Sequence, residues 1–394
     1  MRIGINFHTM DRYISGVEYY CLGLLNGLLR IDQGNDYIVF TNQPDLVGEH
    51  VTAADNLRII EIKHLRTRVA RICWEHTRLP YLALKEKLDV LHCPSYICPL
   101  PKISVPYIVT IHDTIAIDHP RWCKRTNALY FNLFMKTVAK RASCVISVSG
   151  HSTNDIKRNF NLTCSMVRTI HSGIDNIFNT KRNPDRNAWI KARYNLPDRY
   201  ILYVGNIEPK KNISTLLRVQ KELHEKGLPH KLVLVGKRAW SAGAELEEIK
   251  RLAASGNVVR TGYVDRDDLP GVYQMADVFV FPSLYEGFGF PPLEAMACGI
   301  PVIASDSGAL EETLKDAALT VDSQNARQIT QAIILLLKDN QLRNKLIQTG
   351  LKRSGRFNWD RAAEQTLSVY REVSGNCNCQ QVKHTKLDLI KQGV

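Results

Sequence analysis

The chain has 394 residues, 44% hydrophobic and 23% charged, which predicts an ordinary soluble globular protein of about two domains. No apolar run approaches the roughly 20 residues of a membrane span, and the N-terminus enters a strand pattern at once. We therefore expect a cytoplasmic protein without a signal peptide. Its formal net charge of +13 favours phosphate-bearing partners or an anionic membrane face, without choosing among them.

The ten cysteines are scattered, mostly within apolar strands and helices, as at Cys21, Cys93, Cys144 and Cys298. This distribution predicts reduced core thiols rather than disulfides. Cys377 and Cys379 form an isolated pair without the spacing of a zinc site.

The first half of the chain alternates strand and helix patterns. Residues 2–7 (RIGINF) predict the first strand, and an amphipathic helix is expected over residues 17–29. Between them, Gly16 would let the backbone approach a phosphate, although most such glycines only make a turn. This alternation predicts a parallel, doubly wound sheet, with further strands at residues 37–41, 57–62, 90–93, 107–111, 144–148 and 166–170.

Residues 63–87 form a basic stretch with a helical pattern. Cationic side chains alternate with apolar ones, and they include Arg66, Arg68, Arg71 and Arg78 around Trp74. Two interpretations remain open: a helix at a membrane surface, or a surface helix that packs on the sheet by its apolar side.

The strand at residues 107–111 ends in His112-Asp113 (VTIHDT). A histidine at a strand end is often only hydrogen-bonded structure. At the carboxyl edge of a parallel sheet it points into a ligand crevice instead, so His112 becomes a candidate site residue. Asp113 is expected to orient His112 or its loop.

Residues 172–198 are rich in Asn, Asp, Lys and Arg and show no sustained apolar period, so they predict a linker. The α/β pattern then restarts at residues 200–204 and continues to residues 319–321, which predicts a second Rossmann-like domain. Helices are expected over residues 326–338, 341–355 and 359–373, and residues 376–394 read as a mobile basic tail.

The segment YVGNIEPKKN places Lys210 and Lys211 after a strand and before a helix. Lysines at a helix start oppose the helix dipole, which makes sense if an anion binds between the lysine and the backbone N–H groups. A solvated basic loop is the alternative.

The segment FPSLYEGFGFPPLEAMACGIPVIASD follows the buried strand pattern at residues 278–281. A loop with Gly287 and Gly289 leads into a short helix, with Pro291 and Pro292 at its start. Backbone N–H groups at a helix N-terminus, at the carboxyl end of a parallel strand, bind anions and sugar hydroxyls. Glu286 lies on this loop, and Glu294 is expected in the first helical turn, facing the same crevice.

The EGFGFPPLE segment resembles the donor-site signature of the family-4 retaining glycosyltransferases of the GT-B type. The glycine after the first strand, His-Asp, the lysine loop and the Glu-loop-Glu segment occur in the family's order. The resemblance implies an α/β protein with two Rossmann-like domains that face each other across a crevice. Residues 1–172 would bind the acceptor, residues 173–358 would bind the donor, and a helix at residues 359–375 would cross back to the first domain.

The resemblance also implies roles for individual residues. His112 and Glu286 would be catalytic and contact the donor sugar, while Glu294 would accept hydrogen bonds from the ribose and the backbone at Val264 would hold the base. Many family members carry Arg at the position of Asn206, which offers hydrogen bonds but no charge. The donor diphosphate would be bound by Gly16, Asn206, Lys211, Gly287, Phe288, Gly289 and Phe290.

Glu312, in the segment GALEE, lies near the expected crevice. It fits a helix-start carboxylate and a ligand contact equally well.

The implied activity is retaining, metal-independent transfer of a hexose from a nucleoside diphosphate sugar, without a cofactor. TIHDT, WEHTRLP and YVGNIEPKKN are similar to bacterial mannosyltransferases of surface polysaccharide (lipopolysaccharide) assembly. GDP-mannose is therefore the expected donor, with UDP-sugars as the alternative. The expected acceptor is a glycan or polyprenyl-linked glycan, with the enzyme peripheral on the inner membrane face. A non-enzymatic nucleotide- or nucleic-acid-binding module is the alternative from another class. Basic residues do not alternate with aromatic ones in a repeating platform, so we expect no nucleic acid partner.

Overall fold

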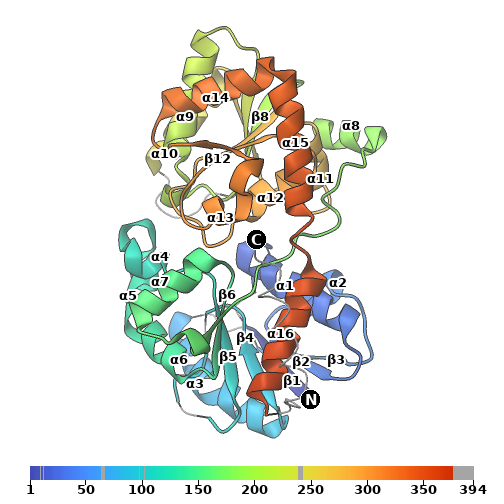
Figure 1. Ribbon diagram of the computed structural model, residues 1–394, viewed down its shortest axis with the longest axis vertical. Coiled ribbons are helices and arrows are strands. Elements are labelled where there is room, and N and C mark those ends of the chain that lie inside the picture. Colours follow the sequence, from blue (N-terminus) through green and yellow to red (C-terminus); the bar gives the residue numbers. More distant parts are fainter. Residues whose placement is uncertain are drawn as a thin grey trace, which may run out of the picture. The chain divides into compact units, whose positions relative to one another are not determined.

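The structure of the protein, a computed structural model, describes residues 1–8, 10–11, 13–63, 67–96, 98–101, 103–237 and 243–375 (Figure 1). The predicted basic tail at residues 376–394, with Cys377 and Cys379, lies outside the described residues, as does Arg66. None of the helices in the described ranges is long and apolar enough to cross a bilayer. Cys21, Cys93, Cys144 and Cys298 are buried free thiols, as expected.

The first sheet has seven strands in the order β3-β2-β1-β4-β5-β6-β7. The pairs β1–β2, β2–β3, β1–β4 and β4–β5 are parallel, and Ile5 lies opposite both Val39 and His92. The central strands are apolar and buried along their length, as expected for a sheet that is covered on both faces. Its strands are β1 (Arg2–Phe7), β2 (Asp36–Thr41), β3 (Leu57–Glu61), β4 (Val90–Cys93), β5 (Tyr107–Ile111), β6 (Cys144–Ser147) and β7 (Val167–Thr169).

The helices of this half connect the parallel strands. The first begins with a capping box, in which Ser15 and Glu18 satisfy free backbone groups at the helix start. A π-helical turn, η2 (Phe131–Met135), joins two of the helices. The helices are α1 (Gly16–Ile31), α2 (Pro44–His50), α3 (Arg68–Lys85), α4 (Ile115–Asp118), α5 (Arg125–Tyr130), α6 (Lys136–Arg141) and α7 (Gly150–Phe160), with the 3-10 turns η1 (Pro120–Trp122) and η3 (Cys164–Met166).

The second sheet has six strands in the order β10-β9-β8-β11-β12-β13, and all five neighbouring pairs are parallel. This is the strand order of a dinucleotide-binding Rossmann fold. Its strands are β8 (Tyr200–Val204), β9 (Lys231–Val235), β10 (Val258–Gly262), β11 (Val278–Phe281), β12 (Val302–Ser305) and β13 (Leu319–Val321). The helices are α9 (Ile213–Glu225), α10 (Gly243–Ala254), α11 (Leu269–Gln274), α12 (Phe290–Ala297), α13 (Leu310–Leu314), α14 (Ala326–Lys338) and α15 (Asn340–Ser354), with the short turns η4 (Pro209–Lys211) and η5 (Lys315–Ala317).

The predicted linker over residues 172–198 contains a helix in its middle, α8 (Pro184–Arg193), which the sequence pattern did not predict. Pro184 occupies the helix start, and the Asn183 side chain accepts a hydrogen bond from Arg186 N at 3.0 Å. Ile190 is the one buried side chain of this helix. Because the helix buries so little apolar surface, its sequence shows no apolar period. Only its capping residues indicate a helix.

The basic stretch at residues 63–87 does form a helix, but α3 begins only at Arg68, where Thr67 accepts from Ala70 N at 3.1 Å. The last described helix, α16 (Trp359–Val373), is fixed to β4 by a hydrogen bond of 2.7 Å between the Tyr370 hydroxyl and His92 Nδ1. The chain divides into two compact units. The first comprises Met1–Thr110, Val138–Val145 and the described chain from Ala362 on, and the second comprises Ile111–Thr137 and Ile146–Arg361.

Candidate functional site

The lysine loop and the loop after β11 are held together by hydrogen bonds in the second unit. Asn212, in the left-handed conformation with φ 56°, donates from its amide to Pro282 O at 3.2 Å and to Ser323 O at 2.6 Å. Leu284 N donates to Lys210 O at 2.8 Å. Both loops follow neighbouring strands of the sheet, β8 and β11, so their polar side chains meet at one edge.

Lys211 and Glu286 meet where these two loops join. Lys211 Nζ lies 2.5 Å from Glu286 Oε1, and Ser283 Oγ donates to the same oxygen at 2.6 Å. Burial raises the pKa of Glu286, but the ammonium groups of Lys211 and Lys210 outweigh it and hold this pKa below its ordinary value. The carboxylate is therefore ionised and carries a fixed cation beside it.

Lys210 is a second cation of the site, which our sequence analysis did not assign to phosphate binding. Burial alone would lower its pKa, but the carboxylates of Asp113, Glu208 and Glu286 raise it above the ordinary value. The ammonium lies 3.8 Å from Glu208 Oε1. The repeated lysine in PKKN was the available signal, and a partly buried lysine beside carboxylates keeps its charge.

The loop that carries Glu286 and Gly287 packs directly against the end of β5, where His112 follows the strand. A Cβ at Gly287 would lie 2.3 Å from the His112 carbonyl oxygen, so only glycine permits this approach. Ser152 Oγ donates to the same carbonyl at 2.9 Å and lies 3.3 Å from Gly287 O. Asp113 accepts from Ile115 N at 3.3 Å and so orders its own loop. The structure thus brings the backbone of His112 against the Glu286 loop.

Helix α12 starts at Phe290, with Gly289 as its N-cap at φ 94°. The first backbone N–H groups of a helix have no partners within it, and this helix start directly follows the loop of Glu286 to Gly289. Phe288 and Phe290 contact each other edge to face, with ring centroids 5.0 Å apart. The sequence prediction of a short helix that ends at Cys298-Gly299 is confirmed.

Glu294 is the fifth residue of α12, so its predicted place in the first helical turn is wrong by one turn. Its carboxylate is 4% exposed and accepts a hydrogen bond from the Tyr273 hydroxyl at 2.8 Å. Burial raises the pKa of Glu294, although Arg266 and Tyr273 oppose that shift. The two glutamates that bracket the loop therefore have opposite pKa shifts, because only Glu286 has ammonium partners.

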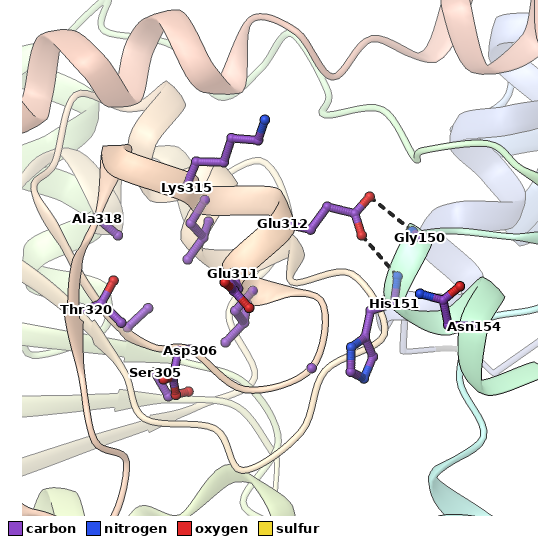
Figure 2. A pocket seen from close by; sticks show the side chains of 14 residues that line it. Gly150, His151, Asn154, Ser305, Asp306, Glu311, Glu312, Lys315, Ala318 and Thr320 are labelled. Atoms are coloured by element: carbon purple, nitrogen blue, oxygen red, sulfur yellow. Dashed lines mark hydrogen bonds between the residues drawn. The ribbon is translucent and has the colours of Figure 1, made fainter.

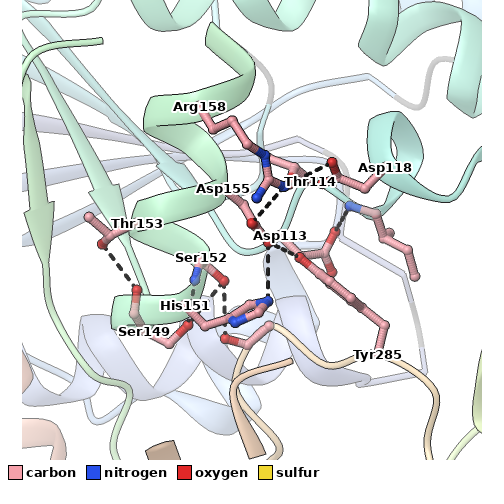
Figure 3. Close-up of polar contacts among 12 residues, drawn as sticks. Asp113, Thr114, Asp118, Ser149, His151, Ser152, Thr153, Asp155, Arg158 and Tyr285 are labelled. Atoms are coloured by element: carbon pink, nitrogen blue, oxygen red, sulfur yellow. Dashed lines mark hydrogen bonds and ion pairs between the residues drawn. The ribbon is translucent and has the colours of Figure 1, made fainter. Parts of the chain in front are cut away.

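A second polar network supports the loop from α7 (Figure 3). The Tyr285 hydroxyl donates to Asp155 Oδ2 at 2.8 Å, and His151 Nε2 lies 3.2 Å from the same oxygen. The hydrogen bond with Asp155 raises the pKa of His151, and Arg158 adds a contact to Asp155 at 2.8 Å. Tyr285, next to Glu286, is thus held by the buried carboxylate of Asp155, which was not among the residues predicted from the sequence.

Glu312 accepts three hydrogen bonds across α13 and α7. Gly150 N and His151 N, at the start of α7, donate at 3.0 and 3.1 Å, and His171 Nε2 lies 2.7 Å away (Figure 2). Burial opposes the shift, but His171 and the two N–H groups lower the pKa of Glu312 to about 2. Glu312 thus binds the N-terminus of a helix other than its own, an arrangement that neither sequence interpretation anticipated.

A pocket of about 690 Å³ opens beside Glu312 (Figure 2). It is lined by polar groups from the ends of β12 and α7 and from α13, among them Ser305, Asp306, Glu311 and Asn154. Gly308, on its wall, packs on the Glu286 loop: a Cβ there would lie 2.4 Å from Glu286 O, and Ala309 N donates to that oxygen at 2.9 Å.

The structure shows fewer contacts for the remaining predicted site residues. Asn206 follows β8 and receives a bond at its carbonyl from the Tyr203 hydroxyl at 3.3 Å. Val264 is buried two residues after β10. Gly16 is the first residue of α1 and belongs to the first unit, whereas the lysine loop and the Glu286 loop belong to the second. No group of three or more His, Cys, Asp or Glu side chains suited to a metal ion occurs within the described ranges.

Two parallel Rossmann-like sheets define an α/β protein of the GT-B class, and the second sheet presents two lysines, a glycine loop and Glu286 at one edge. Two family models match the chain, "Glycosyl transferases group 1" over residues 186–353 and "Glycosyltransferase Family 4" over residues 14–176. The O-antigen chain mannosyltransferase B of Escherichia coli is 31% identical over 299 residues, covering 75% of this chain and 78% of that protein. The chain belongs to the family-4 glycosyltransferases of the GT-B type.

Other relatives agree with this placement. The serotype-specific mannosyltransferase WbdA of Escherichia coli is 28% identical over 94% of this chain, which spans only 46% of WbdA. Among solved structures, Anabaena HepE in complex with UDP-glucose superposes with a TM-score of 0.73 at 17% identity, covering 94% of this chain and all of that one. At that identity the likeness supports the fold alone.

Proposed function

We propose that this glycosyltransferase moves mannose from GDP-mannose, with retention at the anomeric carbon, to a hydroxyl of a polyprenyl-linked glycan in surface polysaccharide assembly. The observation that carries this proposal is the cluster of the partly buried Lys210 and Lys211 with the buried Glu286 beside the N-terminus of α12. A departing diphosphate is stabilised by positive groups, and a sugar that gains positive charge is stabilised by negative ones. The two lysines and Glu286 supply both within a few ångströms.

The two lysines and the first N–H groups of α12 would stabilise the diphosphate as it leaves. Lys210 keeps its charge because carboxylates surround it, Lys211 is paired with Glu286, and Asn212 fixes the loop of both lysines. Charges that are already in position need no reorganisation during the reaction. We propose that these groups neutralise the diphosphate without a metal ion and that the enzyme uses no cofactor.

Glu286 would accept hydrogen bonds from the donor-sugar hydroxyls, because its carboxylate is ionised and fixed by Ser283 and Lys211. His112, held against Gly287, would bind the same sugar from the other side of the loop contact. Glu294 would accept from the ribose, the backbone at Val264 would hold the base, and Gly16 and Asn206 would add diphosphate contacts.

In the proposed reaction the bond from the sugar C1 to the diphosphate oxygen breaks while the acceptor oxygen bonds to C1 on the same face. The acceptor proton passes to the leaving phosphate oxygen, so no enzyme nucleophile and no external base are required. Charge stabilisation and orientation then account for the enzyme's contribution.

Mannose is favoured because two of the relatives are named mannosyltransferases. A UDP-sugar is the second candidate, favoured by the UDP-glucose bound to the Anabaena structure of the same fold. The acceptor proposal implies a cytoplasmic enzyme that binds peripherally to the inner membrane face, and the charge of +13 supports an anionic surface as a partner.

The test is a screen of GDP- and UDP-sugars for hydrolysis and for thermal stabilisation, with and without EDTA. We expect GDP-mannose to stabilise the wild type, with Lys211→Ala and Glu286→Ala abolishing turnover and EDTA having no effect. Stabilisation by a UDP-sugar alone would replace the donor. Loss of activity in EDTA would refute metal independence, and an inverted product by NMR would refute retention.

A further inference from the structure

The surface of residues 121–136 carries a feature that the proposed donor chemistry does not use. Leu129 and Leu133 are 62% and 59% exposed, the highest values among the exposed large hydrophobic side chains of the described chain. Ala128, Tyr130 and Met135, on the same helical run, are buried. The helix therefore packs by one side and presents two leucines to solvent on the other.

The two leucines are four residues apart on a continuous right-handed helical backbone. The helix runs through α5 into the π-helical turn η2, and Phe131 and Lys136 keep helical dihedral angles at its junctions. Residues four apart on a helix lie on the same face, so these leucines form one apolar ridge. Burying these two side chains against an apolar partner would remove their exposed surface from water, which is favourable.

Cations flank this ridge on both sides along the chain. Arg121, Lys124 and Arg125 precede it and Lys136 follows it, and all four side chains are exposed. The sequence has no Asp or Glu from residue 119 to residue 154. Asp118, just before the segment, is neutralised by Arg158 at 3.1 Å. The segment therefore combines an exposed apolar ridge with four exposed cations and no carboxylate of its own.

We propose that residues 121–136 are the membrane-docking surface of this enzyme and that their partner is an anionic lipid bilayer. Leucines that enter the acyl boundary while flanking lysines and arginines meet anionic headgroups are the pattern of an interfacial helix. A protein partner with an apolar groove would not require cations at both ends of the ridge. This inference rests on the proposed function, because a polyprenyl-linked acceptor lies in such a bilayer.

The segment is joined to the candidate site through its own packing. Asn132 Nδ2 donates to Ala116 O at 3.2 Å, in helix α4, which follows His112 and Asp113. His119 stacks on Trp122 with ring centroids 4.3 Å apart and meets the Tyr285 ring edge at 5.8 Å. Tyr285 neighbours Glu286, so a bilayer held at this segment lies one layer of side chains from the donor loop.

Helix α3, which the sequence offered as a membrane helix, is the natural comparison. It exposes Tyr81 and Leu84, each at 53%, beside exposed arginines. Its two exposed apolar side chains are less exposed than Leu129 and Leu133, which are 62% and 59% exposed. We therefore assign docking to residues 121–136, and α3 supplies the matched control.

The test is flotation of the full chain with vesicles of phosphatidylcholine, with or without phosphatidylglycerol. We expect the wild type to bind only the anionic vesicles and to dissociate at about 0.5 M salt, since salt screens surface charge. Leu129→Gln/Leu133→Gln should lower binding about tenfold or more. Lys124→Gln/Arg125→Gln/Lys136→Gln should do the same, and Tyr81→Gln/Leu84→Gln should bind like the wild type.

Both segment variants should keep the wild-type melting temperature, because the replaced side chains are exposed. Wild-type binding by the leucine variant would overturn the proposal, as would equal binding to neutral vesicles or loss of binding in the α3 variant. An absence of vesicle binding would also overturn it and assign the ridge to a protein partner. Donor-sugar hydrolysis in solution separates the two proposals. If hydrolysis fails while vesicle binding holds, the proposed function falls and the docking surface stands.

Discussion

Lys211 Nζ lies 2.5 Å from Glu286 Oε1, although the two residues are 75 positions apart in the chain. Each side chain is nearly buried, with 12% and 10% of its surface exposed. Neither charge could be held here alone without a large desolvation cost. Each side chain therefore compensates the charge of the other, and under the proposed function both charges would meet the donor.

The first prediction is a double-mutant cycle on this pair. Lys211→Met should destabilise the protein by about 3 kcal/mol, because it leaves a buried carboxylate with reduced compensation. Glu286→Gln should cost less, since the amide still accepts from Ser283. The double variant should recover most of the stability in urea unfolding, yet none of the turnover. Equal loss of stability and activity along the cycle would contradict a functional role for the pair.

The second prediction concerns the contact between the donor loop and His112. Gly287→Ala should destabilise the protein by about 2 kcal/mol or more and abolish turnover, because the new Cβ would lie 2.3 Å from a carbonyl oxygen. Gly48→Ala is the control, since Gly48 lies in α2 with no atom within 4 Å of a new Cβ. It should be neutral or slightly stabilising. Thermal unfolding and donor hydrolysis of both variants check this.

Glu312 should make the protein acid-sensitive. Its pKa in the folded protein is about 2, below the ordinary value of 4.5, so its stabilisation is complete above pH 4.5 and is lost as pH falls toward 2. Because 31% of the side chain is exposed to water, we expect about 2 kcal/mol. Glu312→Gln should flatten the dependence of unfolding free energy on pH in that window. Glu311→Gln, on the same helix, should retain it, and an unchanged slope in Glu312→Gln would exclude this role.

Tyr285→Phe removes one donor from the Asp155 carboxylate. Hydrogen bonds to charged groups contribute about 1.5–3 kcal/mol, so we expect a loss of stability in that range. The pKa of Asp155 is lowered in the folded protein, with burial opposed by His151 and Tyr285, and it should rise in this variant. NMR titration of the carboxyl carbon measures the shift. Tyr81→Phe, at an exposed tyrosine, should change neither quantity.

Glu294 provides a test of ribose recognition. Glu294→Gln keeps an oxygen for the Tyr273 hydroxyl but removes the charge, so we expect a higher KM for the donor with kcat nearly unchanged. Removing one ribose hydroxyl from the donor should lower its affinity for the wild type. The same removal should not further lower its affinity for Glu294→Gln. Equal losses for the two enzymes would place the ribose elsewhere.

Much of the fold was readable because its signals are local. Buried strands such as VFVF at residues 278–281 are β-branched or aromatic throughout, and glycine and proline mark their ends. Helix α8 was missed because it buries a single side chain, Ile190, and so lacks periodicity. The start of α3 was placed five residues too early, since basic residues continue through the preceding loop.

The sequence by itself determined the fold class, the family and the joint position of Glu286, Lys211 and His112 at strand ends, because strand ends in a parallel sheet share one edge. Tertiary structure alone decided which groups those side chains contact. The charge on Lys210, the anchoring of Tyr285 by Asp155 and the binding of Glu312 to the start of α7 depend on residues far apart in the chain. Exposure of Leu129 and Leu133 is decided in the same way. Burial and pairing are properties of the packed chain, so no local pattern encodes them.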